Sequence, residues 1–218
     1  LFGISYLPAM IVSAIVIVLY TTLGGFLAAS MTDLIQSIIM TIALLIVVFF
    51  GIHTAGGLDA VITNAKSMSG YLSLTSSYDP ATGVSVPYKG LTIASTLAWG
   101  LGYFGMPHIL LRFMAIEDSR KLTLSRRIAT IWVVISMAIA VSIGIIGYSM
   151  SINGIVPSFG SSSEAETIIV QIAHHLSNNG LLFAMVAGLI LAGILASTMS
   201  TSDSQLLAAS SSVTENLI

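Results

Sequence analysis

Five long stretches of this sequence contain no Asp, Glu, Lys or Arg, and they cover residues 1–32, 34–58, 90–111, 128–163 and 167–202. A helix that crosses a lipid bilayer needs about 20 mostly apolar residues. Each stretch can hold one membrane span, and the expected spans are roughly 6–27, 34–53, 91–114, 128–152 and 181–203. The sequence therefore predicts an all-α fold, a polytopic membrane helix bundle that forms one transmembrane domain over 1–218.

The low content of charged residues supports the same fold class. Of the 218 residues, seven are Lys or Arg and nine are Asp or Glu, which is 7%. A soluble domain carries roughly 25% charged residues, so this composition excludes an ordinary soluble enzyme, a nucleic-acid-binding domain and a disordered chain. The lack of Cys excludes disulfides and thiolate metal sites. Because the sequence opens with Leu1 and stops at Ile218 within helix-like sequence, we expect an internal part of a longer membrane protein.

The distribution of basic residues predicts the orientation of the spans. Five of the seven basic residues lie at or between the third and fourth spans, and they are Arg112, Arg120, Lys121, Arg126 and Arg127. By the positive-inside rule the loop 115–127 is cytoplasmic. Alternation then places a turn at 28–33 inside and the loops 54–90 and 153–180 outside. Within these outer loops we expect an irregular segment at 77–90 and a short interfacial helix at 164–176.

The third span contains a motif that resembles a nucleotide-binding fingerprint. Gly100, Gly102 and Gly105 form the pattern G-x-G-x-x-G. That pattern binds dinucleotides only when it follows a strand and opens a helix. Here it lies inside an apolar segment between Trp99 and Pro107, so we reject nucleotide binding.

The same segment predicts a broken helix. Pro107 has no N–H, so the carbonyl of Tyr103 is expected to lose its helical partner. Within hydrocarbon, such a carbonyl is tolerated only beside protein or a water-filled cavity. Trp99 and Tyr103 lie four residues apart and share a helix face near the break. Two interpretations stay open: a solute site lined by aromatic rings, or a kinked helix packed closely by its glycines.

The fifth span combines small residues with hydroxyl groups. A ladder of small residues at intervals of four predicts close helix packing, and it comprises Gly188, Ala192, Ala196, Ser200 and Ser204. Residues 197–204 carry six hydroxyls and one carboxylate, and Ser197, Ser200, Thr201 and Ser204 share one face. Hydroxyls there can bond to helix carbonyls and leave oxygen atoms facing inward. Close packing alone or a site for a cation such as Na⁺ both agree with this pattern.

Asp33 stands between two charge-free stretches. A charged residue at membrane depth usually has a function. The alternative is a solvated turn, or an N-cap carboxylate that opens the second span with Gln36 three residues later. Both interpretations stay open.

Three segments closely resemble the sodium:solute symporter family, and above all its proline-transporting members. They are YTTLGGFLAASMTDLIQ at 20–36, WGLGYFGMPHILLRFMA at 99–115 and MSTSDSQLLAASSSVTENL at 199–217, and the likeness runs along nearly the whole chain. The resemblance implies a leucine-transporter-type fold of two inverted five-helix repeats, in which this chain supplies core helices four to eight. The third span would then be the broken core helix six.

The resemblance also implies roles for individual residues. Trp99, Tyr103 and Pro107 match positions implicated in solute binding and gating. Ser200 and Thr201 match the pair on core helix eight whose hydroxyls bind Na⁺, and the backbone carbonyl of Ser197 would join them. Asp33 matches a carboxylate on the inner ion pathway, and Arg112 matches a basic residue beside the inner mouth without a defined role.

The function implied is Na⁺-coupled uptake of a small amino acid, foremost L-proline, by alternating access. The expected setting is the plasma membrane of a bacterium, the inner membrane, as a multi-pass protein in the lipid bilayer. The expected partners are the solute and Na⁺, with no other cofactor, no nucleic acid and no requirement for an oligomer. A symporter-like sensor module fused to a signalling domain, or a symporter for another small solute, is the alternative. A passive channel is disfavoured by the broken third span and the closely packed fifth span. A membrane enzyme is disfavoured because no nucleophile–base pair is evident.

Overall fold

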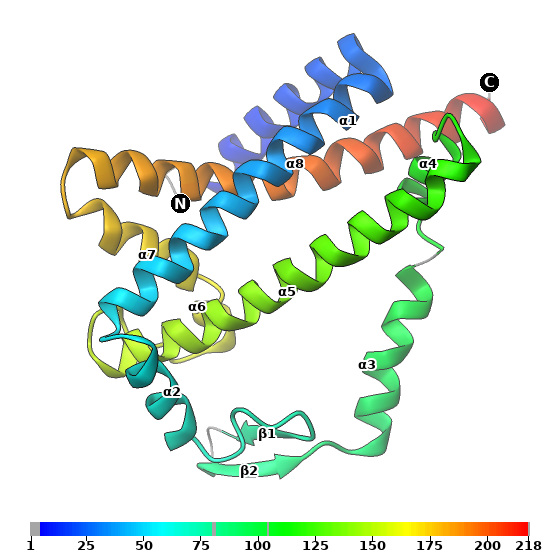
Figure 1. Ribbon diagram of the computed structural model, residues 1–218. Coiled ribbons are helices and arrows are strands. Elements are labelled where there is room, and N and C mark those ends of the chain that lie inside the picture. The colour runs from blue at the N-terminus through cyan, green and yellow to red at the C-terminus, as the bar shows by residue number, and fades with distance from the viewer. Residues whose placement is uncertain (1–4, 80–81, 104, 218) are drawn as a thin grey trace.

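The computed structural model describes residues 5–79, 82–103 and 105–217 and is mostly helical (Figure 1). Its elements, in chain order, are α1 (Tyr6–Thr54), α2 (Leu58–Ser67), β1 (Ser76–Asp79), β2 (Val84–Pro87), α3 (Gly90–Tyr103), α4 (Pro107–Met114), the 3₁₀ helix η1 (Ser119–Lys121), α5 (Leu122–Ile152), α6 (Ser162–Ala165), α7 (Ile168–Ser177) and α8 (Leu181–Leu217).

Three helices within the described residues are long and apolar enough to cross a membrane: Tyr6–Thr54, Ser119–Ile152 and Leu181–Asn216. A span needs about 20 residues, which α3 with 14 residues and α4 with 8 do not reach separately. In α1, a backbone kink at Gly25 divides the 49 residues into two arms. The first arm covers residues 6–24 and the second covers 26–54, so each arm is about as long as one span.

The kink of α1 corrects the turn expected at 28–33. Residues 28–33 are helical, and the break lies at Gly25, whose φ of 56° and ψ of −151° suit glycine and few other residues. The second arm consequently starts earlier than the expected boundary at residue 34. Gly24-Gly25 in the sequence marks the break, whereas Asp33 lies one to two turns inside the helix.

The segment 77–90 is not the irregular loop that we expected. It forms most of an antiparallel hairpin, in which Ser76 pairs with Pro87 and Asp79 with Val84. Gly83, one of the expected turn signals, lies between the two strands, and its N–H donates to the carbonyl of Asp79 at 2.8 Å. Figure 1 shows this hairpin at the end of the molecule between α2 and α3. The phenol of Tyr71 contacts Tyr148 nearby, and burial raises the pKa of Tyr71.

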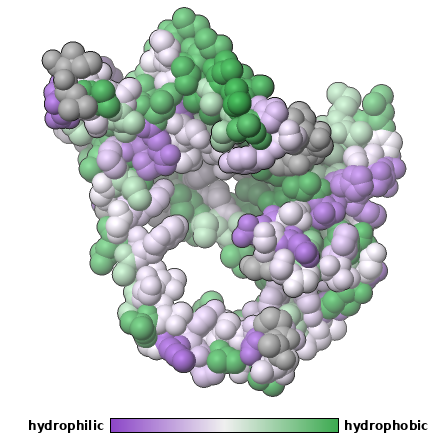
Figure 2. Space-filling model, turned by 180° about the vertical axis from the view of Figure 1, so that it is seen from behind, coloured by the Kyte–Doolittle hydropathy of each residue, from purple (hydrophilic) through white to green (hydrophobic). Residues whose placement is uncertain are grey.

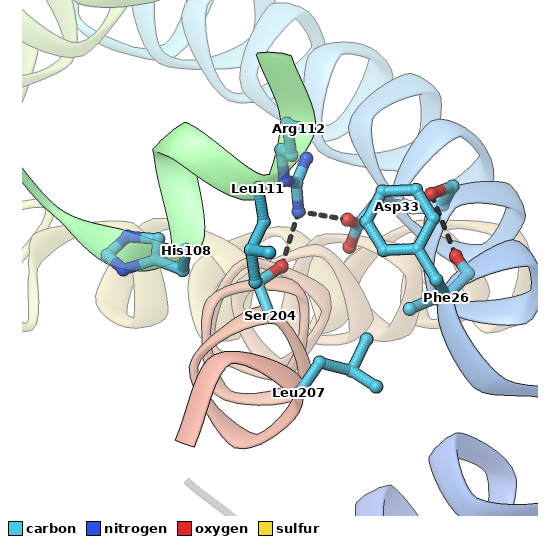
Figure 3. A pocket seen from close by; sticks show the side chains of 9 residues that line it. Phe26, Asp33, His108, Leu111, Arg112, Ser204 and Leu207 are labelled. Atoms are coloured by element: carbon cyan, nitrogen blue, oxygen red, sulfur yellow. Dashed lines mark hydrogen bonds and ion pairs between the residues drawn. The ribbon is translucent and has the colours of Figure 1, made fainter. Parts of the chain in front are cut away.

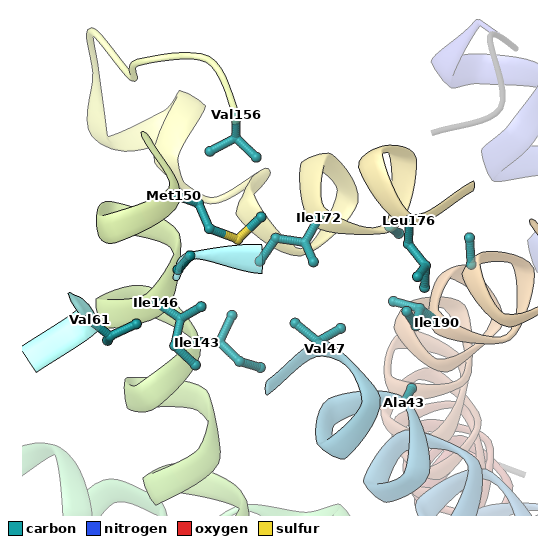
Figure 4. Close-up of a cluster of buried hydrophobic side chains, with 13 residues drawn as sticks. Ala43, Val47, Val61, Ile143, Ile146, Met150, Val156, Ile172, Leu176 and Ile190 are labelled. Carbon is teal, nitrogen blue, oxygen red and sulfur yellow. The ribbon is translucent and has the colours of Figure 1, made fainter. Parts of the chain in front are cut away.

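The hydrophobic core lies where α1, α5, α7 and α8 meet (Figure 4). Side chains from all four helices and from α2 are buried there, and they include Ala43, Val47, Val61, Ile143, Ile146, Met150, Ile172, Leu176 and Ile190. Asn153 donates to the carbonyl of Ala55 at 3.0 Å, and Asn64 donates to the buried hydroxyl of Ser149 at 2.8 Å. These bonds join α2 to α5, and the end of α5 to the end of α1.

The most extensive packing joins α1 to α8, and we call this contact the α1–α8 seam. At Gly193 a Cβ atom would lie 3.1 Å from the Cβ of Ala43 and 3.6 Å from the Cα of Met40, so glycine allows the close approach. The predicted small-residue ladder is only partly the contact face, because Gly188 and Ala192 are exposed whereas Ala196 and Ser204 are buried. Ala187, Ile190 and Gly193 complete the buried stripe.

The arm formed by α3 stands apart from this bundle. Among the described residues, none in α3 is buried. The space-filling view shows an opening bordered by the α3 arm and the hairpin, which no side chain closes (Figure 2). The two helices that make up the predicted third span therefore differ. Helix α4 packs against α8, whereas no residue of α3 is buried in the core.

Candidate functional site: a polar cluster at the α1–α8 seam

Three helices meet at an ion pair that joins distant parts of the sequence. The guanidinium of Arg112 on α4 donates hydrogen bonds to the carboxylate of Asp33 on α1 and to the hydroxyl of Ser204 on α8 (Figure 3). The side chain of Asp33 is 11% exposed and that of Arg112 is 49% exposed. A partly buried pair of this kind interacts more strongly than a surface pair, because less water screens it.

A second carboxylate lies beside the first. Asp203 is completely buried in α8, and its carboxylate accepts hydrogen bonds from the Tyr20 phenol at 2.8 Å and the Ser204 hydroxyl at 3.2 Å. Tyr20 comes from the first arm of α1, 183 residues earlier in the chain. A chain of hydrogen bonds therefore runs from Asp33 through Arg112 and Ser204 to Asp203 and Tyr20, and we call these five residues the seam cluster.

One atom of the seam cluster, the buried Oδ1 of Asp33, has no hydrogen-bond partner among the described residues. The buried Oγ1 of Thr21 and Oε1 of Gln36, which also belong to α1, have none among them either. A small cavity of about 10 Å³ adjoins Asp33, Arg112 and Ser204, which is about the room needed by one water molecule. Oxygen atoms with spare lone pairs beside a cavity can bind water or a cation.

The structure excludes one interpretation of Asp33. As the second arm of α1 is helical from residue 26, Asp33 lies inside the helix and cannot be an N-cap. The hydroxyl of Thr32 bonds backwards to the carbonyls of Ala28 and Ala29, both at 2.9 Å, as expected for the interior of a helix. Asp33 is therefore held by its ion pair with Arg112.

One turn of α8 gathers three oxygen atoms next to the seam cluster. The hydroxyls of Ser200 and Thr201 both donate to the backbone carbonyl of Ser197, at 3.2 and 3.3 Å. Ser204 continues the pattern, since its hydroxyl lies 2.9 Å from the carbonyl of Ser200. Such back-bonding satisfies hydroxyls within an apolar helix and leaves their lone pairs free to accept. Ser200 is half-buried, whereas Ser197 and Thr201 are exposed.

The third predicted span is interrupted, but not in the way expected. Helix α3 ends at Tyr103 and α4 begins at Pro107, with Met106 in an extended conformation between them. The carbonyl of Tyr103 is not left without a partner, because it accepts the N–H of Met106 at 3.3 Å. Similarly, Gly105 donates to the carbonyl of Gly102 at 3.1 Å. Tight 3₁₀-type bonds therefore close the end of α3.

The aromatic residues of α3 face open space. Trp99 is 81% exposed and Tyr103 is 57% exposed, and Pro107 is also exposed at the start of α4. The structure thus groups the predicted ion ligands Ser197, Ser200 and Thr201 on one turn of α8. Asp33 is linked through Arg112 to Ser204, which lies on the following turn of α8. The structure does not bring Trp99 or Tyr103 into the seam cluster.

Sequence reasoning missed two members of the seam cluster, Tyr20 and Asp203, and it named Arg112 and Asp33 without pairing them. Tyr20 carried no signal of its own, and Asp203 was only one carboxylate in a run of hydroxyls. Arg112 stood out as the one basic residue that precedes the loop 115–127, at the end of an apolar stretch. A charge at that place requires a partner, and Asp33, the single carboxylate between two apolar stretches, was a candidate.

Long apolar helices, a kinked α1 and charged residues held within helices of membrane-spanning length define a multi-pass integral membrane protein of the plasma membrane. The model of the sodium:solute symporter family matches residues 1–218, and the chain belongs to that family.

Curated relatives agree with this assignment. The sodium/proline symporter of Escherichia coli (strain K12) is 35% identical over 216 residues, and the osmoregulated proline transporter OpuE of Bacillus subtilis (strain 168) is 37% identical over 216 residues. Each alignment covers 99% of this chain and 40% of the relative. The chain thus spans about two fifths of the length of these relatives. No solved structure matches it significantly.

Proposed function

We propose that the protein containing this chain is a Na⁺-coupled symporter of a small amino acid, with L-proline as the foremost solute. The observation that carries the proposal is the turn of α8 where Ser197, Ser200 and Thr201 bring three oxygen atoms together, in a chain of the sodium:solute symporter family. Relatives named as sodium/proline symporters supply the solute and the ion. The relatives named here are transporters, so the sensor alternative is not favoured.

In this proposal Na⁺ binds at the hydroxyls of Ser200 and Thr201 and the carbonyl of Ser197. Neutral oxygens suit a hard monovalent cation, and lone pairs remain on both hydroxyls after they bond the carbonyl. In the family's fold of two inverted five-helix repeats, the chain would supply core helices four to eight. The expected five spans, and the cytoplasmic position of 115–127, belong to the same proposal.

The solute would bind at Trp99, Tyr103 and Pro107. Their exposure suits a surface that other parts of the protein complete, and the helix interruption resembles those that bind solutes in transporters. Na⁺ would leave along a path past Asp33. Alternating access couples the two ligands if both prefer the same conformation.

The direct test is uptake of radiolabelled proline by the intact protein in vesicles, with inward Na⁺ and K⁺ gradients compared. We expect uptake to follow the Na⁺ gradient, and equal uptake with K⁺ would contradict coupling. The variant Ser200→Ala should weaken the apparent Na⁺ affinity about tenfold, or about 1.4 kcal/mol. A matched control is Ser210→Ala on the same helix, since Ser210 is exposed and bonds only to its own helix at Leu207. An unchanged Na⁺ dependence in Ser200→Ala would remove the ion site from this turn.

A further inference from the structure

Two arginines near the start of α5 have side chains without partners among the described residues. Arg126 and Arg127 are exposed, and neither guanidinium forms an ion pair or a hydrogen bond with the part of the chain that the structure describes. The other two basic residues of the segment 115–127 are matched, since Arg120 and Lys121 each pair with a carboxylate of that segment. A guanidinium keeps its charge in proteins. Two positive charges at this end of α5 are therefore left without a counter-charge.

Arg126 and Arg127 flank the side of α5 that is turned away from α1. Trp132 marks the side that faces α1, because its indole N–H donates to the hydroxyl of Thr41 at 3.2 Å, and Ile143 continues the same face into the core. At about 100° per residue, Arg126 lies about 120° from Trp132 in one direction and Arg127 about 140° in the other. The two guanidiniums thus stand on either edge of the opposite face.

Thr130 lies between the two arginines, one turn further along α5. It is four residues from Arg126 and three from Arg127, which are the spacings of neighbours on a helix surface. In an apolar helix a hydroxyl commonly bonds back to its own backbone, as that of Ser142 does to the carbonyl of Ala138 at 2.8 Å. The exposed hydroxyl of Thr130 makes no such bond within the described chain. Three hydrogen-bond donors therefore lie within one turn, an arrangement that suits an anion with several oxygen atoms, such as a phosphate.

The same face of α5 becomes apolar beyond Thr130. Val134, Met137 and Val141 follow it at intervals of three or four residues, and we call them the apolar stripe. Each of the three is at least 61% exposed, since the buried residues of α5 begin only at Ile143. In a helix of membrane-spanning length, such a face is suited to contact with lipid acyl chains.

We propose that this face of α5 binds an anionic phospholipid from the leaflet on the side of 115–127. The phosphate lies between Arg126, Arg127 and Thr130, and an acyl chain follows the apolar stripe. A phospholipid carries its phosphate directly above its acyl chains, so one molecule supplies both the missing negative charge and the apolar cover. A zwitterionic lipid fits less well, because its headgroup brings a cation of its own next to the two guanidiniums. The inference depends on α5 crossing the membrane, and it is independent of the solute and the coupling ion.

The direct test is binding of phosphatidylglycerol with a tritiated headgroup to the intact protein, immobilised in detergent for scintillation proximity counting. The buffer contains about 0.15 M salt, which limits unspecific attraction to a range of about 8 Å. Unlabelled phosphatidylglycerol should displace the label from the parent, and phosphatidylcholine with the same acyl chains should need a concentration at least about tenfold higher. Equal displacement by both lipids would overturn the role of charge. Displacement by inorganic phosphate at the concentration of phosphatidylglycerol would indicate a site for free phosphate and would overturn the lipid.

The first test variant combines Arg126→Gln with Arg127→Gln. We expect it to weaken binding of phosphatidylglycerol about 25-fold, since each basic side chain near an anionic membrane contributes about fivefold. The matched control combines Arg120→Gln with Lys121→Gln, which removes two charges from the same segment, but from side chains that have carboxylate partners. We expect the control to change the affinity less than about threefold. A similar loss in both variants would mean that the lipid responds only to the net charge of the segment, and the site would be abandoned.

The second test variant, Thr130→Val, keeps the shape of the side chain and its suitability for a membrane helix. It decides the proposal even if the arginine variant does not insert correctly. The lost hydrogen bond to a charged phosphate should weaken binding about tenfold. Ser125→Ala is its control, because Ser125 is also exposed and its hydroxyl has no partner within the described chain, but it lies about 20° from Trp132 on the side that faces α1. Unchanged affinity in Thr130→Val, or an equal loss in Ser125→Ala, would show that the phosphate does not lie on this face. None of these measurements uses uptake, so a failure of sodium coupling would leave them unaffected.

Discussion

The α1–α8 seam and the α3 arm differ in how much of their surroundings this chain supplies. In the seam, Gly193 lies against Ala43, and Asp203 is completely buried and accepts a hydrogen bond from the Tyr20 phenol. In the arm, Trp99 is 81% exposed. Side chains in the seam are therefore buried and closely packed by this chain itself. Side chains in the α3 arm are not covered by any of the described residues. Substitutions in the seam should therefore change stability first, and substitutions in the arm should change ligand binding first.

The largest effect on stability is expected at the closest contact of the seam. In Gly193→Val, the new Cβ would lie 3.1 Å from the Cβ of Ala43, and the two methyl groups would force α1 and α8 apart. Overpacking of this kind costs about 1–3 kcal/mol. The measurement is thermal unfolding of the intact protein in detergent.

Gly188→Val is the matched control for that substitution. It adds the same side chain to the same helix, but a Cβ there meets nothing within 4 Å. We expect its unfolding temperature to stay close to that of the parent. If both variants unfold at the same temperature, the seam is not the tight contact described.

The comparison also shows what a single sequence can predict. The helix break before Pro107 follows from a local rule, because proline cannot donate to Tyr103. The back-bonded hydroxyls at Ser200 and Thr201 are equally local. Both features were predicted because they depend on residues within four positions of one another.

Long-range pairs were not predicted. The bond between Tyr20 and Asp203 spans 183 positions, and the ion pair of Asp33 with Arg112 spans 79. Nothing in local pattern specifies such partners, although a lone charge in an apolar stretch indicates that one exists. The hairpin at Ser76–Pro87 was missed for a related reason, since each strand has only four residues and β1 carries no alternation of apolar and polar residues.

A smaller loss of stability is expected from the charged part of the seam. Tyr20→Phe removes the phenol that donates to Asp203 at 2.8 Å and leaves the buried carboxylate with one donor fewer. A hydrogen bond to a charged group contributes about 1.5 kcal/mol, which is below the upper end of the range expected for Gly193→Val. Thermal unfolding of the intact protein should show this loss.

Tyr6→Phe tests whether that loss depends on the seam. Tyr6 lies on the same helix but is 81% exposed, so the loss of its hydroxyl should change stability by less than about 0.5 kcal/mol. The variant Asp203→Asn, alone and with Tyr20→Phe, completes a double-mutant cycle. Strict additivity in that cycle would mean that the two side chains do not interact.

The smallest effect on stability is expected in the arm, at Trp99→Ala. Because Trp99 has few neighbours to lose, its removal should change the unfolding free energy by less than about 0.5 kcal/mol. The same variant should raise the half-saturating proline concentration of Na⁺-driven uptake by about tenfold, or about 1.4 kcal/mol, because an aromatic face that covers the solute is lost. Leu97→Ala is the control, since Leu97 is 73% exposed on the same helix but is not among the proposed solute-binding residues. Wild-type solute affinity in Trp99→Ala would remove this residue from the site. A large loss of stability would show instead that the arm is packed in the intact protein as firmly as the seam, and the contrast between the two regions would then disappear.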